Sequence, residues 1–180
     1  MSLRNTDTQY GCVTKTLHWI VMILVIGMLI AGFFMGDIPS KPIKGQVYTL
    51  HKLIGLFLLC VGLLFLFWSK TGSKPKYPAE MKCWEKGLAK LIQICLFIVL
   101  IGMPLAGWVM SSAAGYYPSF FGLFEIPMPW IPKSEALKNT AGDMHYYFAW
   151  SFVVLISIHA LGALKHHFID KNDVLKRMMR

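Results

Sequence analysis

Four long stretches of the chain carry no charged side chain, and polar or proline-rich segments separate them. There are 21 uncharged residues between Lys15 and Asp37, 17 between Lys52 and Lys70, 34 between Lys90 and Glu125, and 21 between Asp143 and Lys165. A helix that crosses a bilayer needs about 20 mostly apolar residues, within a range of about 17 to 25. The pattern therefore predicts four membrane-spanning helices.

The third stretch is too long for one span, and from Gly115 onward the chain carries four prolines, within the stretch and just after it. These are Pro118, Pro127, Pro129 and Pro132. Proline in a helix interior removes a hydrogen bond and clashes with the preceding turn. We therefore place the spans near residues 16–36, 51–69, 88–110 and 144–165, and expect a loop of about 30 residues from Ser111 to Asp143.

Composition agrees with a membrane protein: 56% of the residues are hydrophobic and 15% are charged, whereas soluble proteins carry about 25% charged residues. The first apolar stretch is longer than the roughly 7 to 15 residues of a cleaved signal peptide, so we expect it to be retained. Four spans leave little chain for a soluble domain. The prediction is one domain over residues 1–180, an all-α transmembrane four-helix bundle.

The net charge of +9 is distributed unevenly between the two sides of the predicted bundle. Thirteen of the 18 basic residues fall in the N-terminal segment, the middle connection and the C-terminal tail, and five fall in the other two connections. Lysine and arginine are enriched in cytoplasmic segments, so both termini are predicted to be cytoplasmic. The basic residues thus reflect topology and contact with anionic lipid, and we expect no nucleic-acid partner.

Four histidines lie within or at the mouths of the spans: His18, His51, His145 and His159. Ionisable side chains inside a membrane usually face the bundle interior and mark a functional path, and neutral imidazole is a common metal ligand. Any one of them alone fits a hydrogen bond between helices or at the interface. Their joint arrangement favours a cofactor.

His145 and His159 are 14 residues apart on one span, which separates them by about 21 Å along the axis and leaves them about 40° from the same direction. They share one face at different depths. With the predicted topology, His51 matches the outer depth of His145, and His18 matches the inner depth of His159. Two such pairs suit two haems with two histidine ligands each, whereas zinc needs its ligands gathered at one point.

Haem attachment is predicted to be non-covalent, because none of the four cysteines forms a C-x-x-C-H or C-x-x-C pattern. Cations near the helix ends are candidates for contact with haem propionates or a quinone: Lys15, Lys52, Lys165, His166 and His167. Lysines at helix ends also snorkel to the membrane surface without a specific partner, so both interpretations stay open for these residues.

Several motifs together resemble the prokaryotic cytochrome b561 family. They are Thr16-Leu17-His18-Trp19, His51-Lys52-x-x-Gly55, Pro104-x-x-Gly107-Trp108-Val109-Met110 with the following Ser111-Ser112-Ala113-Ala114-Gly115, Phe121-Gly122-Leu123, and His159-Ala160-x-x-Ala163-Leu164-Lys165-His166-His167-Phe168. The resemblance covers nearly the whole chain. It implies a bacterial inner-membrane cytochrome with two b haems, held by His18 with His159 and by His51 with His145. It also implies a superoxide oxidase type of activity, in which superoxide is oxidised at the outer face and ubiquinone is reduced.

Three positions depart from the family pattern. Relatives often carry arginine where this chain has Phe65 and Ser69, and histidine where it has Gln93. Lys70 or Lys74 is a candidate to replace a lost cation, without the planar fork of arginine. The four candidate haem ligands are unaffected by these departures.

Two functions remain open. The first is a superoxide:ubiquinone oxidoreductase, to which a cationic outer mouth would steer an anionic substrate. The second is a non-catalytic electron relay, the cytochrome b subunit of a dehydrogenase or hydrogenase-like complex, with an unidentified protein partner. The loop with Tyr116, Tyr117, Phe120, Phe121 and Trp130 is either a cover over the outer haem or a partner-binding surface. A bundle without cofactor is the third possibility, tested by the absorption spectrum.

Overall fold

Four long helices make up most of the protein in the computed structural model, which describes residues 2–120 and 122–179. They are α1 (Cys12–Phe34), α2 (Lys41–Lys70), α3 (Cys83–Ala113) and α4 (Glu135–Phe168). Three smaller pieces accompany them: the 3-10 turn η1 (Met35–Asp37), a hairpin of β1 (Ser119–Phe120) and β2 (Phe124–Glu125), and the single-turn helix α5 (Lys176–Met179). The all-α prediction is confirmed.

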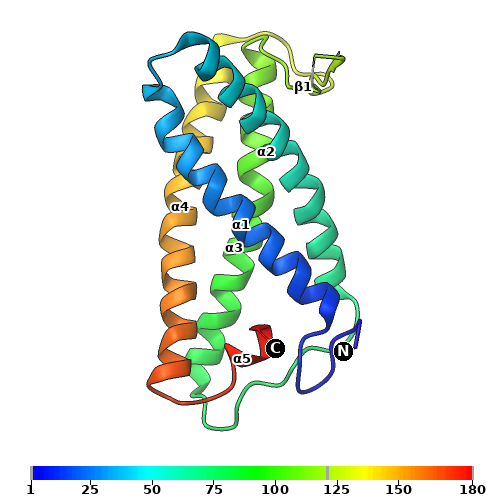
Figure 1. The fold of residues 1–180 in the computed structure, drawn as a ribbon, viewed down its shortest axis with the longest axis vertical. Coiled ribbons are helices and arrows are strands. Elements are labelled where there is room, and N and C mark those ends of the chain that lie inside the picture. Colours follow the sequence, from blue (N-terminus) through cyan, green and yellow to red (C-terminus); the bar gives the residue numbers. More distant parts are fainter. Residues whose placement is uncertain (1, 121, 180) are drawn as a thin grey trace.

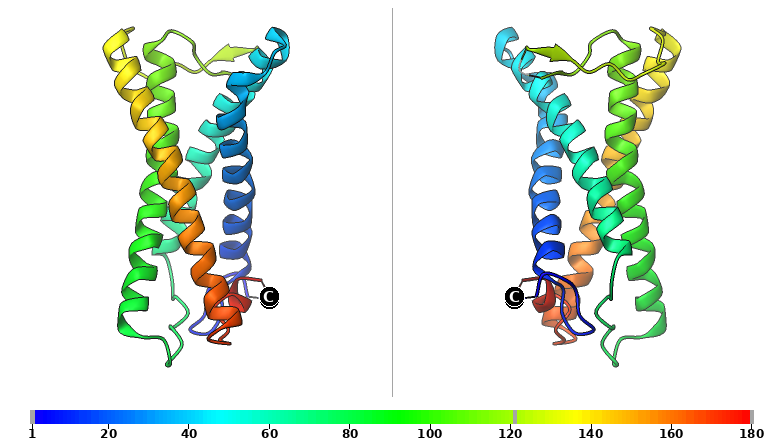
Figure 2. Two further views of the ribbon diagram at one scale, coloured as in Figure 1. Left: turned by 90° about the vertical axis from the view of Figure 1, so that its left-hand side faces the viewer. Right: turned by 90° about the vertical axis from the view of Figure 1, so that its right-hand side faces the viewer.

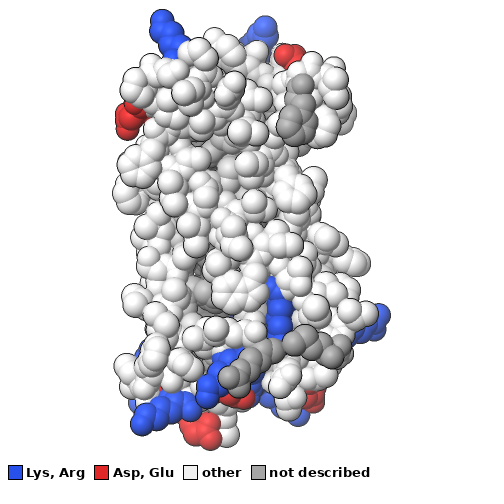
Figure 3. Space-filling view, viewed as in Figure 1, with Lys and Arg blue, Asp and Glu red and all other residues white. Residues whose placement is uncertain are grey.

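All four long helices are long and apolar enough to cross a membrane. Charged residues gather near the two ends of the molecule on the face shown in Figure 3, and an uncharged band lies between them. Both termini lie at one end of the bundle (Figure 1). We call it the terminus end, and we call the opposite end, where residues 114–120 and 122–134 lie, the loop end.

Helix α4 begins at Glu135, nine residues before the predicted span, so the expected loop from Ser111 to Asp143 was too long. The Ser134 hydroxyl accepts a hydrogen bond from the backbone N–H of Leu137 at 3.3 Å, the arrangement that commonly starts a helix. The Glu85 carboxylate likewise accepts from the N–H of Lys82 at 2.9 Å at the start of α3. Capping therefore lengthens helices beyond the apolar stretches that revealed them.

Packing divides the bundle into two pairs, because α1 contacts α2 and α3 contacts α4, while α2 joins the pairs through α3. The α3–α4 contact is close: a Cβ added to Gly102 would lie 2.9 Å from the Phe148 ring. Figure 2 shows that the two pairs lean apart toward the loop end, where the connection between α3 and α4 crosses between them.

A buried apolar layer occupies the middle of the bundle. Val25, Leu58, Leu100 and Phe152 contribute one side chain from each long helix, and each is 5% exposed. Val99 and Met103 complete the same cluster. The layer separates the loop end from the terminus end.

The segments at the terminus end are tied to one another. Lys76 of the α2–α3 connection donates its backbone N–H to the carbonyl of Asp7 at 2.9 Å, and the Arg177 guanidinium donates to the Lys76 carbonyl at 2.5 Å. The Trp19 indole N–H donates to the Met178 carbonyl at 3.2 Å. The N-terminal segment, the connection and the tail thus form one layer beneath the bundle.

Candidate cofactor site

Helix α4 places functional side chains in one column. His145, Phe152, His159 and His166 are seven residues apart, and seven residues advance a helix by about 10.5 Å and return within about 20° of the same direction. His18 and Val25 repeat this interval on α1, and His51 and Leu58 repeat it on α2. The apolar layer therefore lies between two levels of histidines. The seven-residue interval is present in the sequence, but the prediction used only the 14-residue spacing of His145 and His159.

At the loop end, His51 of α2 and His145 of α4 face each other with ring centres 6.2 Å apart and ring planes at 71°. The Nδ1 atom of His145 lies 3.0 Å from the Met103 carbonyl oxygen of α3. A carbonyl can only accept, so this contact places the proton on Nδ1 and leaves Nε2 with its lone pair. That is the tautomer a metal ligand needs.

Two glycines make room for these rings. A Cβ on Gly107 of α3 would lie 3.0 Å from both Cε1 and Nδ1 of His145, and a Cβ on Gly32 of α1 would lie 3.3 Å from Cε1 of His51. Both distances are shorter than ordinary contacts of 3.4–4 Å. The glycines therefore allow each imidazole to lie directly against a neighbouring helix.

At the terminus end, His18 of α1 and His159 of α4 have ring centres 6.3 Å apart and ring planes at 48°. His159 is exposed although it faces His18. The Trp19 ring meets the His18 ring edge-on at 5.4 Å. Depth and helix face predicted both histidine pairs, and the structure brings the same partners together.

The ring separations fit one metal ion between each pair. A metal–imidazole bond is about 2.0–2.1 Å, and a ring nitrogen is roughly 1.1 Å from its ring centre, so rings on opposite sides of one ion have centres roughly 6.3 Å apart. Among the described residues, the buried Nδ1 atoms of His18 and His51 have no hydrogen-bond partner. Among the described residues there is no group of three or more metal-ligating side chains. Two ligands per level suit a haem, whose ring supplies the other four.

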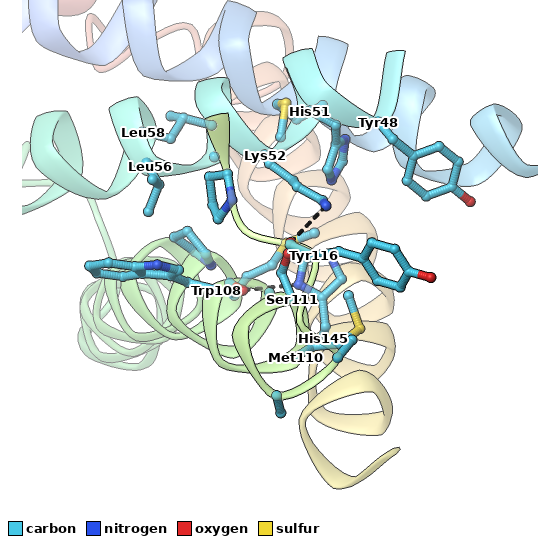
Figure 4. A pocket seen from close by; sticks show the side chains of 18 of the residues that line it. Tyr48, His51, Lys52, Leu56, Leu58, Trp108, Met110, Ser111, Tyr116 and His145 are labelled. Carbon is cyan, nitrogen blue, oxygen red and sulfur yellow. Dashed lines mark hydrogen bonds between the residues drawn. The ribbon is translucent and has the colours of Figure 1, made fainter. Parts of the chain in front are cut away.

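A cavity of about 910 Å³ opens at the loop-end pair. Figure 4 shows His51 and Lys52 on α2 facing His145, Ser111 and Tyr116 across it. The wall is mostly apolar, with Val25, Met28, Leu58 and Phe152 at its depth. Pockets for small molecules commonly measure about 300–1,000 Å³, so this space is large enough for a flat, mainly apolar group.

Lys52, a candidate propionate contact, is tied to the cover of this cavity. Its ammonium donates to the Tyr116 carbonyl at 2.9 Å and lies 5.8 Å from the centre of the Tyr116 ring. The Ser111 hydroxyl donates to the same carbonyl. Two donors thus hold residue 116 over the mouth, and Lys133 and Ser134 line the cavity from the same connection.

The remaining loop aromatics differ in position. Tyr116 lines the cavity, whereas Trp130 is 96% exposed. Phe120 stacks on Phe124 with ring centres 5.2 Å apart. Phe121 lies outside the described residues. The connection therefore covers the cavity with one part and presents apolar surface with another.

Lys165 and His166, expected near propionates or a quinone, belong to an ion cluster at the terminus end. The Lys165 ammonium pairs with Glu85 of α3 and with Asp170 at 2.7 Å. The Nδ1 atom of His166 lies 2.7 Å from the same Asp170 oxygen. The hydrogen bond from Lys165 lowers the pKa of Asp170 below its ordinary value, so the carboxylate stays ionised at neutral pH.

Lys15 and His167 are the other two residues expected near propionates or a quinone. Lys15 is half-buried on α1. Among the described residues, the buried Nδ1 atom of His167 has no hydrogen-bond partner, and its ring centre lies 4.8 Å from that of Phe168.

Three positions depart from the family pattern. Phe65 packs on Phe97 with ring centres 5.3 Å apart. The Ser69 hydroxyl donates to the Leu66 carbonyl at 2.7 Å, and Gln93 is exposed.

Comparison with known proteins identifies the family of this chain. A family model described as prokaryotic cytochrome b561 matches residues 9–180. The chain belongs to the prokaryotic cytochrome b561 family. It is 33% identical to cytochrome b561 homolog 2 of Escherichia coli (strain K12), over 99% of this chain and 95% of that protein. It is 29% identical to cytochrome b561 homolog 1 of the same organism, over 91% and 92%, and 25% identical to the probable superoxide oxidase CybB of Yersinia pestis, over 95% and 96%.

Membership makes this a multi-pass electron-transfer protein of the bacterial inner membrane, with haem b as the cofactor the family implies. The paired histidines of this chain have the ring separations that a haem iron between them requires. When bound, haem would supply a one-electron carrier, and the paired histidines and the apolar walls would hold it.

Proposed function

We propose that the protein is a di-haem b-type cytochrome in which His51 with His145 and His18 with His159 are the axial ligands. The observation that carries the proposal is the pair of ring separations, 6.2 and 6.3 Å. A haem iron with two histidine ligands has no free axial position, which suits electron transfer better than oxygen binding. The excess of basic residues at the terminus end supports a cytoplasmic location for that end.

We further propose that the reaction is superoxide:ubiquinone oxidoreduction. Superoxide gives up one electron at the loop end and leaves as dioxygen; two such electrons and two protons convert ubiquinone to ubiquinol. Lys52, Lys133 and Lys138 line the loop-end cavity together with Glu135, which pairs with Lys138 at 2.7 Å. Lys52 and Lys133 remain as cations at the mouth, and cations there raise the encounter rate with an anion. The name of the Yersinia pestis relative, probable superoxide oxidase, supports the same activity.

A non-catalytic relay is the second candidate, and the exposed loop surface favours it. Trp130 and Leu123 are 96% and 78% exposed at the loop end, and exposed aromatic and apolar residues are typical of partner-binding surfaces. In that case a partner protein, and not superoxide, delivers the electron to the loop end.

Stopped-flow spectroscopy of the oxidised holoprotein distinguishes the two candidates. Superoxide is added with and without ubiquinone-1, and the b-type absorbance is followed. The oxidase predicts rapid reduction by superoxide followed by reoxidation with ubiquinone-1. Inertness toward superoxide would contradict the oxidase and favour the relay.

The ligand assignment is tested separately with alanine variants. His51→Ala and His145→Ala are expected to lose the same spectral component, and His18→Ala and His159→Ala the other, each leaving about one haem per chain. Loss patterns that mix the pairs would contradict the assignment. A purified protein without a reduced-minus-oxidised b-type signal would contradict the whole proposal.

A further inference from the structure

The wall of the loop-end cavity changes from apolar to cationic between its depth and its mouth. The central apolar layer closes its deep side. The charged side chains in its wall are Lys52, Lys133, Lys138 and Glu135. Three lysines and one carboxylate give the described wall a net charge of +2, and Glu135 pairs with Lys138 at 2.7 Å. The excess positive charge therefore belongs to Lys52 and Lys133.

Lys52 lies between the histidine pair and the cover of the cavity. It directly follows the candidate ligand His51 on α2, and Figure 4 shows its side chain extending toward Tyr116. Its ammonium donates to the Tyr116 carbonyl at 2.9 Å. An ammonium has three N–H donors, so two are left for an acceptor inside the cavity. Within residues 2–120 and 122–179, no ion pair includes Lys52.

Lys133 reaches the same place from the far end of the α3–α4 connection. Its side chain passes directly over Gly115, because a Cβ added there would lie 2.8 Å from Cε and 3.2 Å from Nζ of Lys133. Gly115 also has a φ of +75°, which only glycine adopts readily. The glycine thus leaves the path by which the Lys133 ammonium comes next to residue 116. Lys133, too, is absent from the ion pairs of the described residues.

The polarity of this cavity corresponds to that of haem b. The ring is hydrocarbon along most of its edge and carries two propionates, with two negative charges, on one side. Carboxylates in a largely apolar cavity need a cation or a hydrogen-bond donor close by. Lys52 and Lys133 supply two unpaired ammonium groups at the mouth, one for each propionate. The sequence indicated Lys52 as a candidate contact, and the structure adds Lys133.

We infer that Lys52 and Lys133 bind the two propionates of the loop-end haem at the mouth of the cavity. The inference rests on the proposed di-haem function. It orients the ring with its hydrocarbon edge against the central apolar layer and its carboxylates toward the loop end. The opposite orientation would bury two carboxylates against hydrocarbon and leave both ammonium groups unpaired. The lysines also cancel two negative charges that would otherwise repel superoxide from the mouth.

The test compares haem with its dimethyl ester, in which both propionates are uncharged. The full chain is synthesised in phosphatidylcholine nanodiscs with either form, and transfer to excess apomyoglobin is followed by absorbance. The component that His145→Ala lacks marks the loop end, and the other component is an internal reference. The variants are Lys52→Met, Lys133→Met and the double variant. The matched control is Lys41→Met, because Lys41 is exposed on the first turn of α2 and lies outside the cavity wall.

Each single lysine variant should release the loop-end haem about 5- to 10-fold faster, and the double variant about 25- to 100-fold faster. A hydrogen bond to a charged group contributes about tenfold or more to binding, and solvent at the mouth reduces this. Wild-type protein should release the dimethyl ester as fast as the double variant releases haem. Release of the ester should be equal in the wild type and all variants, and Lys41→Met should match the wild type with both forms.

Equal release of haem and ester from the wild type would overturn the inference and leave the ligand assignment intact. This comparison also decides the case if the lysine variants do not fold. A parallel acceleration for haem and ester in the variants would assign the lysines a structural role and overturn the inference too, as would an effect of one lysine alone. If the wild type has no component that His145→Ala loses, the proposed di-haem function itself fails, and the inference with it.

Discussion

Gly107→Ala is expected to weaken haem binding at the loop end only. The added Cβ would lie 3.0 Å from Cε1 and Nδ1 of His145, where ordinary contacts are 3.4–4 Å. The ring must therefore move by about 0.4 Å or more away from α3, which lengthens its 3.0 Å contact with the Met103 carbonyl. Pro104 and the α3–α4 contact at Gly102 leave the backbone little freedom to follow.

The magnitude follows from two costs. Loss of the hydrogen bond costs about 1 kcal/mol, and crowding in a packed site costs about 1–3 kcal/mol. A total of about 2–4 kcal/mol corresponds to about 30- to 700-fold weaker binding, since about 1.4 kcal/mol is tenfold. Changes next to metal-ligating histidines commonly cost about 10- to 100-fold.

The assay is a haem-to-protein ratio from the pyridine haemochrome spectrum, combined with a redox titration that resolves the two haems. Gly27→Ala is the matched control, because Gly27 lies inside α1 and a Cβ there would meet nothing within 4 Å. Gly107→Ala should lose the same component as His145→Ala, whereas Gly27→Ala should keep both. Full occupancy and unchanged potentials in Gly107→Ala, or an equal loss in Gly27→Ala, would refute the reasoning.

Two further predictions concern stability and the terminus end. Phe152→Ala should destabilise the bundle by about 3–5 kcal/mol, because Phe152 is 5% exposed in the apolar layer. Thermal unfolding in detergent measures the loss. Val154→Ala is the control and should have little effect, because Val154 is 55% exposed on the same helix. Trp19→Phe removes the hydrogen bond to the Met178 carbonyl at a cost of about 1 kcal/mol. The C-terminal tail should then detach about five-fold more often, and carboxypeptidase should trim it about five-fold faster. Equal trimming rates would contradict the contact.

The four helices were predictable because absence of charge over 17 to 34 residues is a strong signal. The ends of the helices were less predictable, because an apolar stretch indicates which residues contact lipid, whereas the position of a helix terminus depends on capping. Ser134 begins α4 well outside the apolar stretch. Ser134 is a common type of helix-capping residue, but a prediction based on apolar stretches does not take capping residues into account.

The pairing of the histidines was predictable because depth and face follow from residue spacing along single helices. The carbonyl of Met103 and the space above Gly107 were not, because they depend on how α3 is rotated against α4. Lys165 illustrates the same limit. Glu85, its partner, is 80 residues away in the chain, and no spacing rule connects the two.

The central layer of Val25, Leu58, Leu100 and Phe152 has a consequence for bioenergetics. Four buried hydrocarbon side chains offer no polar atom to a hydrated ion or to a chain of water molecules, whereas an electron crosses such a barrier by tunnelling. In the proposed di-haem arrangement, the layer would block the passage of protons while electrons pass between the two haems. Each turnover of the proposed reaction would carry negative charge across the membrane, and no proton leak through the layer would lower the proton-motive force.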